Sequence, residues 1–172
     1  MAAPEDSAAP DPVAARRRLG RMIGGFLECL KARARDVAPG LTIQHLEPAD
    51  PDRMIDLCRG YDVGLSVEQP DVQNRALCLT NKALTYPLAG IAVALTDTPG
   101  QRRFGRALGE GAWLYQPGDI AAFAAGLTRW ASEPARLVAA KRAAWLAAQA
   151  RWHWEHAEER GALLDAFSAA VT

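Results

Sequence analysis

The feature that most constrains the fold is a regular alternation of short apolar runs with amphipathic segments. The apolar runs cover residues 61–67, 91–96 and 112–115, and each is bounded by glycine or polar residues. Such runs are typical of buried strands, whereas the segments at about 80–89 and from Thr98 onward have helical spacing. Strands that are apolar on both faces need helices on both faces. The sequence therefore predicts an α/β protein with a single doubly wound parallel sheet.

The region before this alternation is predicted to continue the same pattern. Residues 41–46 are expected to form a strand, and residues 51–59 a short helix. An earlier helix ends at Pro39-Gly40 and carries one apolar stripe that we expect to be buried. Its members are Met22, Ile23, Phe26, Leu27 and Leu30.

Three helices are predicted to end the chain, at residues 119–131, 133 to about 148 and about 152–169. Helix-start residues support this division, because Thr98 and Asp119 stand where N-caps are needed and Pro99 occupies a first-turn position. The C-terminal helices are therefore expected to complete the layers around the sheet.

A length of 172 residues with 49% hydrophobic residues suits one core, so a single domain is predicted over residues 15–172. Residues 1–14 are alanine, proline and acidic residues with few large apolar side chains. We expect them to form a disordered lead-in.

Composition excludes several kinds of partner. Because 20 basic residues balance 20 acidic ones, the chain lacks the positive field that nonspecific nucleic-acid binding needs.

The three cysteines, Cys29, Cys58 and Cys78, have no metal or redox spacing and are interpreted as reduced core thiols. No apolar run reaches the roughly 20 residues of a transmembrane helix. A cytoplasmic protein without a transmembrane segment is therefore expected.

Ligands of open parallel sheets bind at the carboxyl ends of the strands. Lys82 is predicted in the first turn of a helix at this edge, where the helix dipole disfavours a cation, so a negative group is expected nearby. A phosphate held by first-turn amides would supply that charge. The alternative is that Lys82 points to solvent or pairs with Glu68 or Asp71.

Other candidate sites have less support. The turn TDTPGQ could bring Gly100 close to a ligand, but a simple strand-to-helix connection explains it equally well. His153 and His156 lie one helical turn apart, yet two histidines on an acidic helix are usually only surface residues, so no metal site is predicted. His45 is interpreted as structural. No catalytic set can be assigned from spacing.

The segments YDVGLSVE and NKALTYPLAGIAVALTDTPGQ resemble the carboxyl-terminal domain of GT-B fold glycosyltransferases of retaining family 4, also called glycosyl transferases group 1. The likeness extends over roughly residues 18–167. It implies a Rossmann-like half of a GT-B fold that binds a UDP- or GDP-sugar without a further cofactor. Donor-binding residues expected on this basis are Glu68, Thr80, Asn81, Lys82, Thr85, Thr98, Pro99, Gly100 and Gln101.

Two departures from this resemblance bear on activity. The family usually has a glutamate for the nucleotide ribose where this chain has Thr85, and a hydroxyl cannot replace that carboxylate. The acceptor-binding domain is also missing, so a separate acceptor domain or self-association is expected. Two hypotheses follow: a transferase half that is inactive alone, or a degenerate binding or regulatory module.

Overall fold

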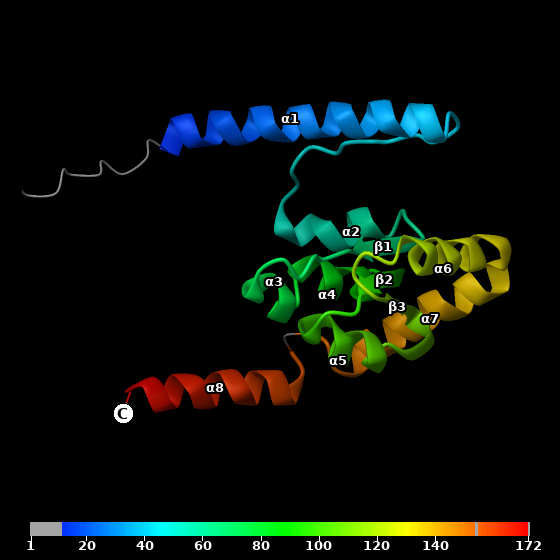
Figure 1. Ribbon diagram of the computed structural model, residues 1–172. Coiled ribbons are helices and arrows are strands. Elements are labelled where there is room, and N and C mark those ends of the chain that lie inside the picture. Colours follow the sequence, from blue (N-terminus) through cyan, green and yellow to red (C-terminus); the bar gives the residue numbers. More distant parts are fainter. Residues whose placement is uncertain (1–11, 154, 172) are drawn as a thin grey trace, which may run out of the picture. The chain divides into compact units, whose positions relative to one another are not determined.

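The computed structural model describes residues 12–153 and 155–171 and divides the chain into two compact units, residues 1–48 and 49–172 (Figure 1). The predicted lead-in lies largely outside the described residues, and the first helix begins at Pro12. The elements in chain order are α1 (Pro12–Val37), η1 (Pro51–Arg53), α2 (Met54–Cys58), β1 (Val63–Ser66), α3 (Gln73–Leu77), α4 (Asn81–Leu88), β2 (Ala92–Thr96), α5 (Pro99–Ala107), η2 (Gly109–Gly111), β3 (Ala112–Tyr115), α6 (Ile120–Ser132), α7 (Pro134–Ala150) and α8 (Ala157–Val171).

The first unit contains α1, a single helix of 26 residues. The prediction that its apolar stripe is buried is wrong for Phe26 and Leu30, whose side chains are exposed, Phe26 to 70%. The predicted strand at residues 41–46 is also wrong, because this segment has no strand structure. Alternating side chains do not make a strand unless the backbone groups pair with a neighbour.

The second unit is an α/β unit around a three-stranded parallel sheet of order β1-β2-β3. Val63 of β1 pairs with Ala92 of β2, and Thr96 of β2 pairs with Tyr115 of β3. The strands predicted at residues 61–67, 91–96 and 112–115 and their parallel arrangement are confirmed. The strand order does not reverse among the described residues, so the doubly wound arrangement stays a prediction.

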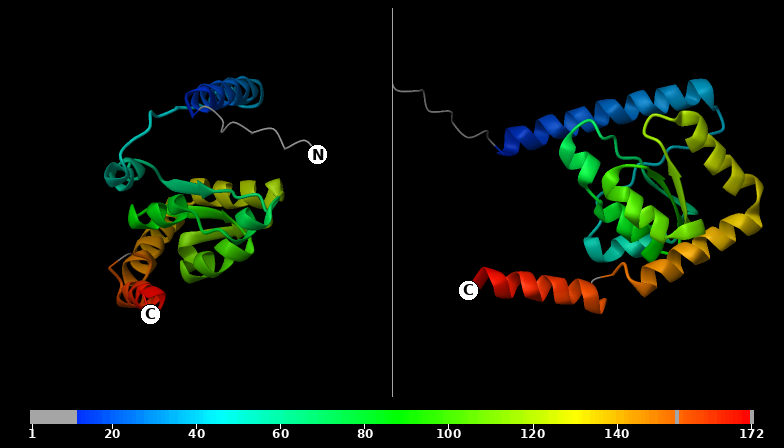
Figure 2. Two further views of the ribbon diagram at one scale, coloured as in Figure 1. Left: turned by 90° about the vertical axis from the view of Figure 1, so that its left-hand side faces the viewer. Right: turned by 60° about the horizontal axis from the view of Figure 1, so that its bottom comes forward.

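Helices cover both faces of this sheet, as Figure 2 shows from two further directions. On one face, Val93 and Leu95 of β2 pack with residues of α4 and α5, among them Phe104. On the other face, Ala92 and Ala94 pack with Trp130 of α6 and with the first half of α7. All five residues of β2 are buried. Alanine suits the second face because large indoles fill the space above it.

Helix α7 passes from one face of the sheet to the other. Ala140 belongs to the cluster on the α6 face, whereas Ala147 packs against the cluster of α4 and α5. Between them, a Cβ atom at Gly111 would collide with the backbone of Ala144, so glycine allows the close crossing. Lys141 of α7 pairs with Asp62, the residue before β1, at 3.0 Å. Helix α7 therefore borders the amino edge of the sheet.

Local sequence signals explain where the helices begin. The Thr98 hydroxyl accepts a hydrogen bond from the Gln101 amide, and the Asp119 carboxylate accepts one from the Ala122 amide at 2.9 Å. Helix α3 is absent from the sequence prediction, since it has five residues and no apolar periodicity. The last helix begins at Ala157, later than predicted, because Trp152 leaves the helical path and packs edge-on against Phe104 with ring centroids 5.0 Å apart.

The structure bears on two further expectations, the burial of the three cysteines and the absence of a transmembrane helix. Cys29 is exposed, so it is not a core thiol, whereas Cys58 and Cys78 are partly buried, and all three are free. Among the described residues, no helix combines the length and apolarity needed to cross a bilayer.

Gly64 tests how closely α4 packs on β1. A Cβ atom at this position would overlap the ring of Tyr86, whose hydroxyl donates to the Leu65 carbonyl at 3.4 Å. We expect Gly64→Ala to lower the free energy of unfolding by about 1–3 kcal/mol, measured by urea denaturation, because the aromatic ring must move. The control is Gly60→Ala, where a Cβ atom has only an ordinary contact of 3.7 Å. Equal stability of the two variants would contradict this packing.

Candidate functional site

The carboxyl edge of the sheet brings together three chain segments. Strand β1 ends at Ser66, β2 at Thr96 and β3 at Tyr115, and Glu68, Asp97 and Gln116 follow them closely. Since the strands are parallel, these ends lie at one edge of the sheet. The helix starts of α4 and α5 lie beside them, at Asn81 and Pro99. This is the predicted location of a ligand site.

Hydroxyl and amide groups tie the strand ends together. The Thr96 hydroxyl donates to the Glu68 carbonyl at 2.8 Å, and the Gln101 side-chain amide donates to the same hydroxyl oxygen at 2.9 Å. The hydroxyl oxygens of Ser66 and Thr80 lie 3.4 Å apart. Ser66, Thr96 and Gln101 are fully buried. These bonds fix the loop after β1 against the end of β2, which positions Glu68.

Lys82 forms an ion pair with Glu68, with Nζ and Oε1 2.7 Å apart. Of the alternatives open from sequence, pairing with Glu68 is the one observed, and Asp71 pairs with Arg75 instead. The distance is short, but Oε1 does not meet hydrogen-bond geometry, so the attraction is mainly coulombic. The Lys82 side chain is 43% exposed and that of Glu68 16%. The ammonium group is therefore held at the strand ends yet reachable from solvent.

The start of α4 has an uncapped first turn. Thr80 is the N-cap residue, but its side chain makes no capping hydrogen bond, and its hydroxyl lies beside Ser66 instead. The helix predicted at about residues 80–89 is confirmed, and its first turn begins at Asn81. The Ala83 amide donates to the Thr80 carbonyl at 3.0 Å, which leaves the amides of Asn81 and Lys82, together with the helix dipole, to favour a negative group at this point. Thr85 lies one turn further along, where its hydroxyl donates to the Asn81 carbonyl at 2.9 Å.

The turn from Thr98 to Gln101 has a structural role in this conformation. Thr98 and Gln101 are fully buried, and a Cβ atom at Gly100 would collide with the backbone of Leu77. The close approach that glycine allows is therefore between two parts of the chain. Pro99 is the exposed member of the turn. The structure thus brings Glu68, Thr80, Asn81 and Lys82 together at the surface and places Thr98 and Gln101 beneath it.

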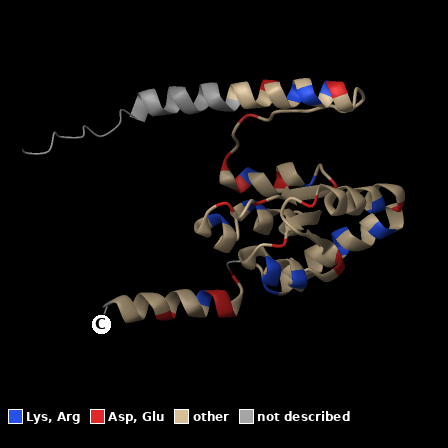
Figure 3. Cartoon of the chain, viewed as in Figure 1, with Lys and Arg blue, Asp and Glu red and all other residues tan. Residues whose placement is uncertain are grey.

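Asp97 joins β2 to α5 and β3 and was not singled out by sequence reasoning. Its carboxylate accepts hydrogen bonds from Arg102 Nε at 2.7 Å and from Gln116 Nε2 at 3.0 Å. The Arg102 hydrogen bond is the main cause that holds the pKa of Asp97 below its usual value. Arg103 and Arg106 add positive charge to α5, as the blue segments of Figure 3 show. The available signal was an aspartate directly after a buried strand.

The histidines singled out from sequence do not form a metal site. His153 Nε2 lies 3.1 Å from the Gln149 carbonyl, and His156 Nδ1 accepts from the Glu158 amide at 3.3 Å. Among the described residues, no group of three potential metal ligands comes together. His45 is exposed in the first unit.

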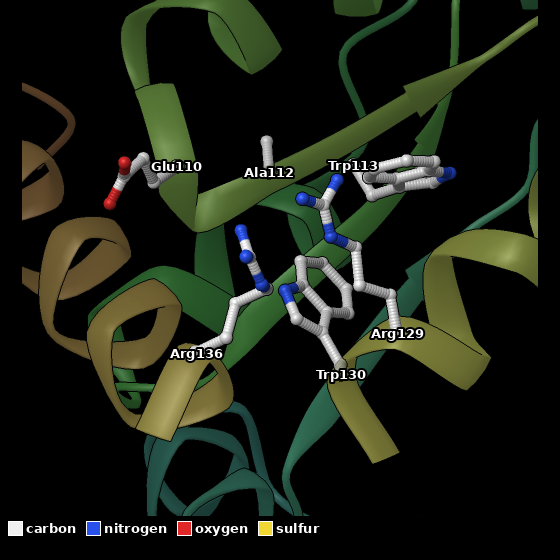
Figure 4. Close-up of a pocket in the computed structure, with 6 residues that line it drawn as sticks. All are labelled: Glu110, Ala112, Trp113, Arg129, Trp130 and Arg136. Carbon is white, nitrogen blue, oxygen red and sulfur yellow. The ribbon is translucent and has the colours of Figure 1, made fainter. Parts of the chain in front are cut away.

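A pocket of about 180 Å³ lies at the opposite, amino end of β3 (Figure 4). Its walls are formed by Glu110, Ala112, Trp113, Arg129, Trp130 and Arg136, none of which was predicted to bind a ligand. Sequence reasoning missed this pocket because its residues come from η2, β3, α6 and α7. The sheet therefore has two polar edges that could hold a ligand.

The fold and the polar carboxyl edge define an α/β protein with a parallel sheet, compatible with a Rossmann-like fold. Comparison of the chain with protein-family models, curated proteins and solved structures finds no significant match.

The Asp97 network predicts a pH-dependent contribution to stability. Because the folded-state pKa of Asp97 is lowered, its stabilising effect is present above the unfolded pKa of about 3.9 and is lost as the pH falls through the folded pKa. We expect Asp97→Asn to lower the free energy of unfolding at neutral pH by about 1 kcal/mol, and by less near about pH 2.5.

Urea denaturation at both pH values measures this difference. Asp56→Asn is the control, since Asp56 forms an exposed ion pair with Arg59 at 2.6 Å outside this network. An Asp97→Asn effect that is equally large at both pH values would contradict the assignment of the stabilisation to the ionised carboxylate.

Proposed function

We propose that the α/β unit binds the diphosphate of a nucleotide sugar at the carboxyl edge of its sheet, as the donor-binding half of a glycosyltransferase. The observation that carries the proposal is the position of Lys82 in the uncapped first turn of α4, next to the strand ends. UDP- or GDP-sugar is the proposed substrate class, and the acceptor is unspecified. No cofactor is included in the proposal.

The electrostatics of this edge suit a multiply charged phosphate group. First-turn amides and the positive end of the α4 dipole attract anions, and an ammonium group adds a full charge. Lys82 is bound to Glu68 without hydrogen-bond geometry, so its N–H donors can turn to a phosphate oxygen. The fixed loop between Ser66 and Glu68 keeps this lysine near the edge in the absence of ligand.

In the proposed reaction, the sugar leaves the nucleoside diphosphate, and negative charge grows on the phosphate oxygen that is released. Lys82 and the first-turn amides of α4 would stabilise this charge. Transfer also needs an acceptor that is held against the donor and shielded from water. We propose that a separate acceptor-binding domain or a second copy supplies that surface, and that the chain alone is inactive.

A second candidate is a glycosyltransferase-like binding or regulatory module that has lost its affinity for donor. Two observations favour it. Glu68 already supplies the negative partner that Lys82 requires, at 2.7 Å. The Thr85 hydroxyl, at the position where the resembled family has a carboxylate for ribose, is engaged with the Asn81 carbonyl. Nucleotide binding therefore distinguishes the two candidates.

Thermal denaturation with UDP or GDP tests the role of Lys82. At a nucleotide concentration ten times Kd, we expect the Tm of the wild-type chain to rise by about 3–5 °C. Lys82→Ala should abolish this rise, because it removes the cation that faces the phosphates. Lys141→Ala is the matched control, since Lys141 also pairs with a carboxylate but at the amino edge, and its variant should keep the rise.

The possible outcomes separate the two candidates. No rise in Tm with any nucleotide at millimolar concentration would support the degenerate module. A rise that persists in Lys82→Ala would show that nucleotide binds elsewhere.

Glu68→Gln tests whether the carboxylate competes with phosphate for Lys82. Pyrophosphate is the probe, because it lacks the ribose that a carboxylate could hold. We expect titration calorimetry to show pyrophosphate binding about two- to five-fold tighter in the variant, since the competing charge is gone. Glu47→Gln, in the first unit, is the control for a general change of charge. Weaker binding in Glu68→Gln would contradict this competition.

A further inference from the structure

The pocket at the amino end of β3 contains hydrogen-bond donors that the fold does not use. Its walls combine two indoles, two guanidinium groups and one carboxylate around Ala112. In Figure 4 the indole of Trp130 stands between the side chains of Arg129 and Arg136, with its ring nitrogen on the side of Arg136. Helices α6 and α7 meet here at the turn around Glu133, which brings both arginines to one place.

Trp130 carries the strongest signal of a ligand. The residue is 4% exposed, and its indole N–H has no acceptor among the described residues but is not itself fully buried, so it reaches the space of the pocket. The neighbouring Trp113 differs, because its indole nitrogen donates to the Ala122 carbonyl at 3.0 Å. A donor that opens into a pocket can bond to water, and a ligand oxygen can take the place of that water. The indole of Trp130 is thus poised for an acceptor inside the pocket.

The two arginines direct further donors to the same space. Arg136 Nε lies 2.8 Å from Glu133 Oε2, and Arg129 Nε lies 3.8 Å from Glu133 Oε1. Both contacts use Nε, and only that of Arg136 is a hydrogen bond. The terminal nitrogens of the two guanidinium groups have no partner within the described part of the chain. A guanidinium fork pairs well with the two oxygens of a planar carboxylate.

Glu110 limits the charge that the pocket can accept. Its carboxylate also lines the pocket, and Glu133 already offsets part of the charge of the two arginines. A dianion such as phosphate would meet repulsion from Glu110, whereas a monoanion gains the same donors with less repulsion. The indole of Trp113 and Ala112 provide apolar walls for the rest of a ligand.

We propose that this pocket binds a small organic monocarboxylate with an apolar body, whose oxygens accept from Trp130 and from the guanidinium groups of Arg129 and Arg136. This site lies at the amino edge of the sheet, opposite the proposed diphosphate site. It is formed entirely within the α/β unit and does not depend on nucleotide-sugar binding. The chain would thus have a second binding site, for a small molecule of a different chemical class.

Nuclear magnetic resonance of the ¹⁵N-labelled full chain tests the proposal with benzoate as probe. The Trp130 indole N–H signal is assigned by its absence in Trp130→Phe. We expect benzoate to shift this signal in a saturable manner, because the N–H gains an acceptor. The indole signal of the exposed Trp145 should not move. This readout is independent of any enzymatic activity.

A matched pair of arginine variants tests the contacts. Arg136→Gln should weaken benzoate binding by about tenfold or more, because a charge-assisted pair is lost. Arg142→Gln, an exposed arginine on the same helix, should leave it unchanged. If Arg136→Gln fails to fold, Arg129→Gln gives the same comparison from α6.

Two results would overturn the proposal. One is the absence of a saturable shift of the Trp130 signal with millimolar benzoate in the folded wild-type chain. The other is an affinity for inorganic phosphate equal to that for benzoate, which would contradict the preference for an organic monocarboxylate.

Discussion

The structure of the α/β unit depends on the complete burial of β2 between two layers of helices. Side chains of β2 alternate between the faces, so Val93 and Leu95 belong to one core cluster while Ala92 and Ala94 belong to the other. One cluster draws residues from α4 and α5 and the other from α6 and α7, so neither layer can be lost without uncovering one side of the strand. The backbone of β2 is equally committed, because it pairs with β1 and β3 on its two edges. The central position of β2 in the sheet, rather than any single contact, therefore determines where the neighbouring strands and helices lie.

The same strand organises the carboxyl edge. Thr96, its last residue, bonds the loop after β1 through the Glu68 carbonyl, and Asp97, the next residue, reaches α5 and β3 through Arg102 and Gln116. The core thus determines where the polar groups of the edge lie, and the edge hydrogen bonds in turn keep the loops from opening. A change in the packing of β2 is expected to reach Lys82 through Glu68, although Lys82 is a surface residue.

The sequence predicts the elements whose signal is local and repeated. The strands at residues 63–66, 92–96 and 112–115 and helices α4 to α7 were identified because apolar runs and N-caps such as Asp119 are properties of neighbouring residues. Apart from the parallel arrangement of the strands, features that depend on distant partners were not predicted. Residues 41–46 have strand-like alternation but form no strand, and Phe26 is exposed although it belongs to an apolar stripe. In the site, the location of Lys82 followed from the helix start, whereas its choice of Glu68 over Asp71 depended on the loop path. The Trp130 pocket needed the end of α6, the start of α7 and the start of β3 in one place.

The two edges of the sheet differ in what an anion must displace, and this difference underlies the two ligands that we propose for them. At the carboxyl edge, Lys82 already has a carboxylate partner, so a ligand must replace one negative charge before it gains anything. A diphosphate can do so because it carries several charges and also reaches the first-turn amides of α4, whereas a monoanion would exchange one ion pair for another of similar strength. At the amino edge, the Trp130 N–H has no acceptor among the described residues, so the proposed carboxylate would replace only solvent there. The proposed ligands differ accordingly: a highly charged diphosphate at the edge where the cation is already paired, and a monocarboxylate at the edge where the donors are open to solvent.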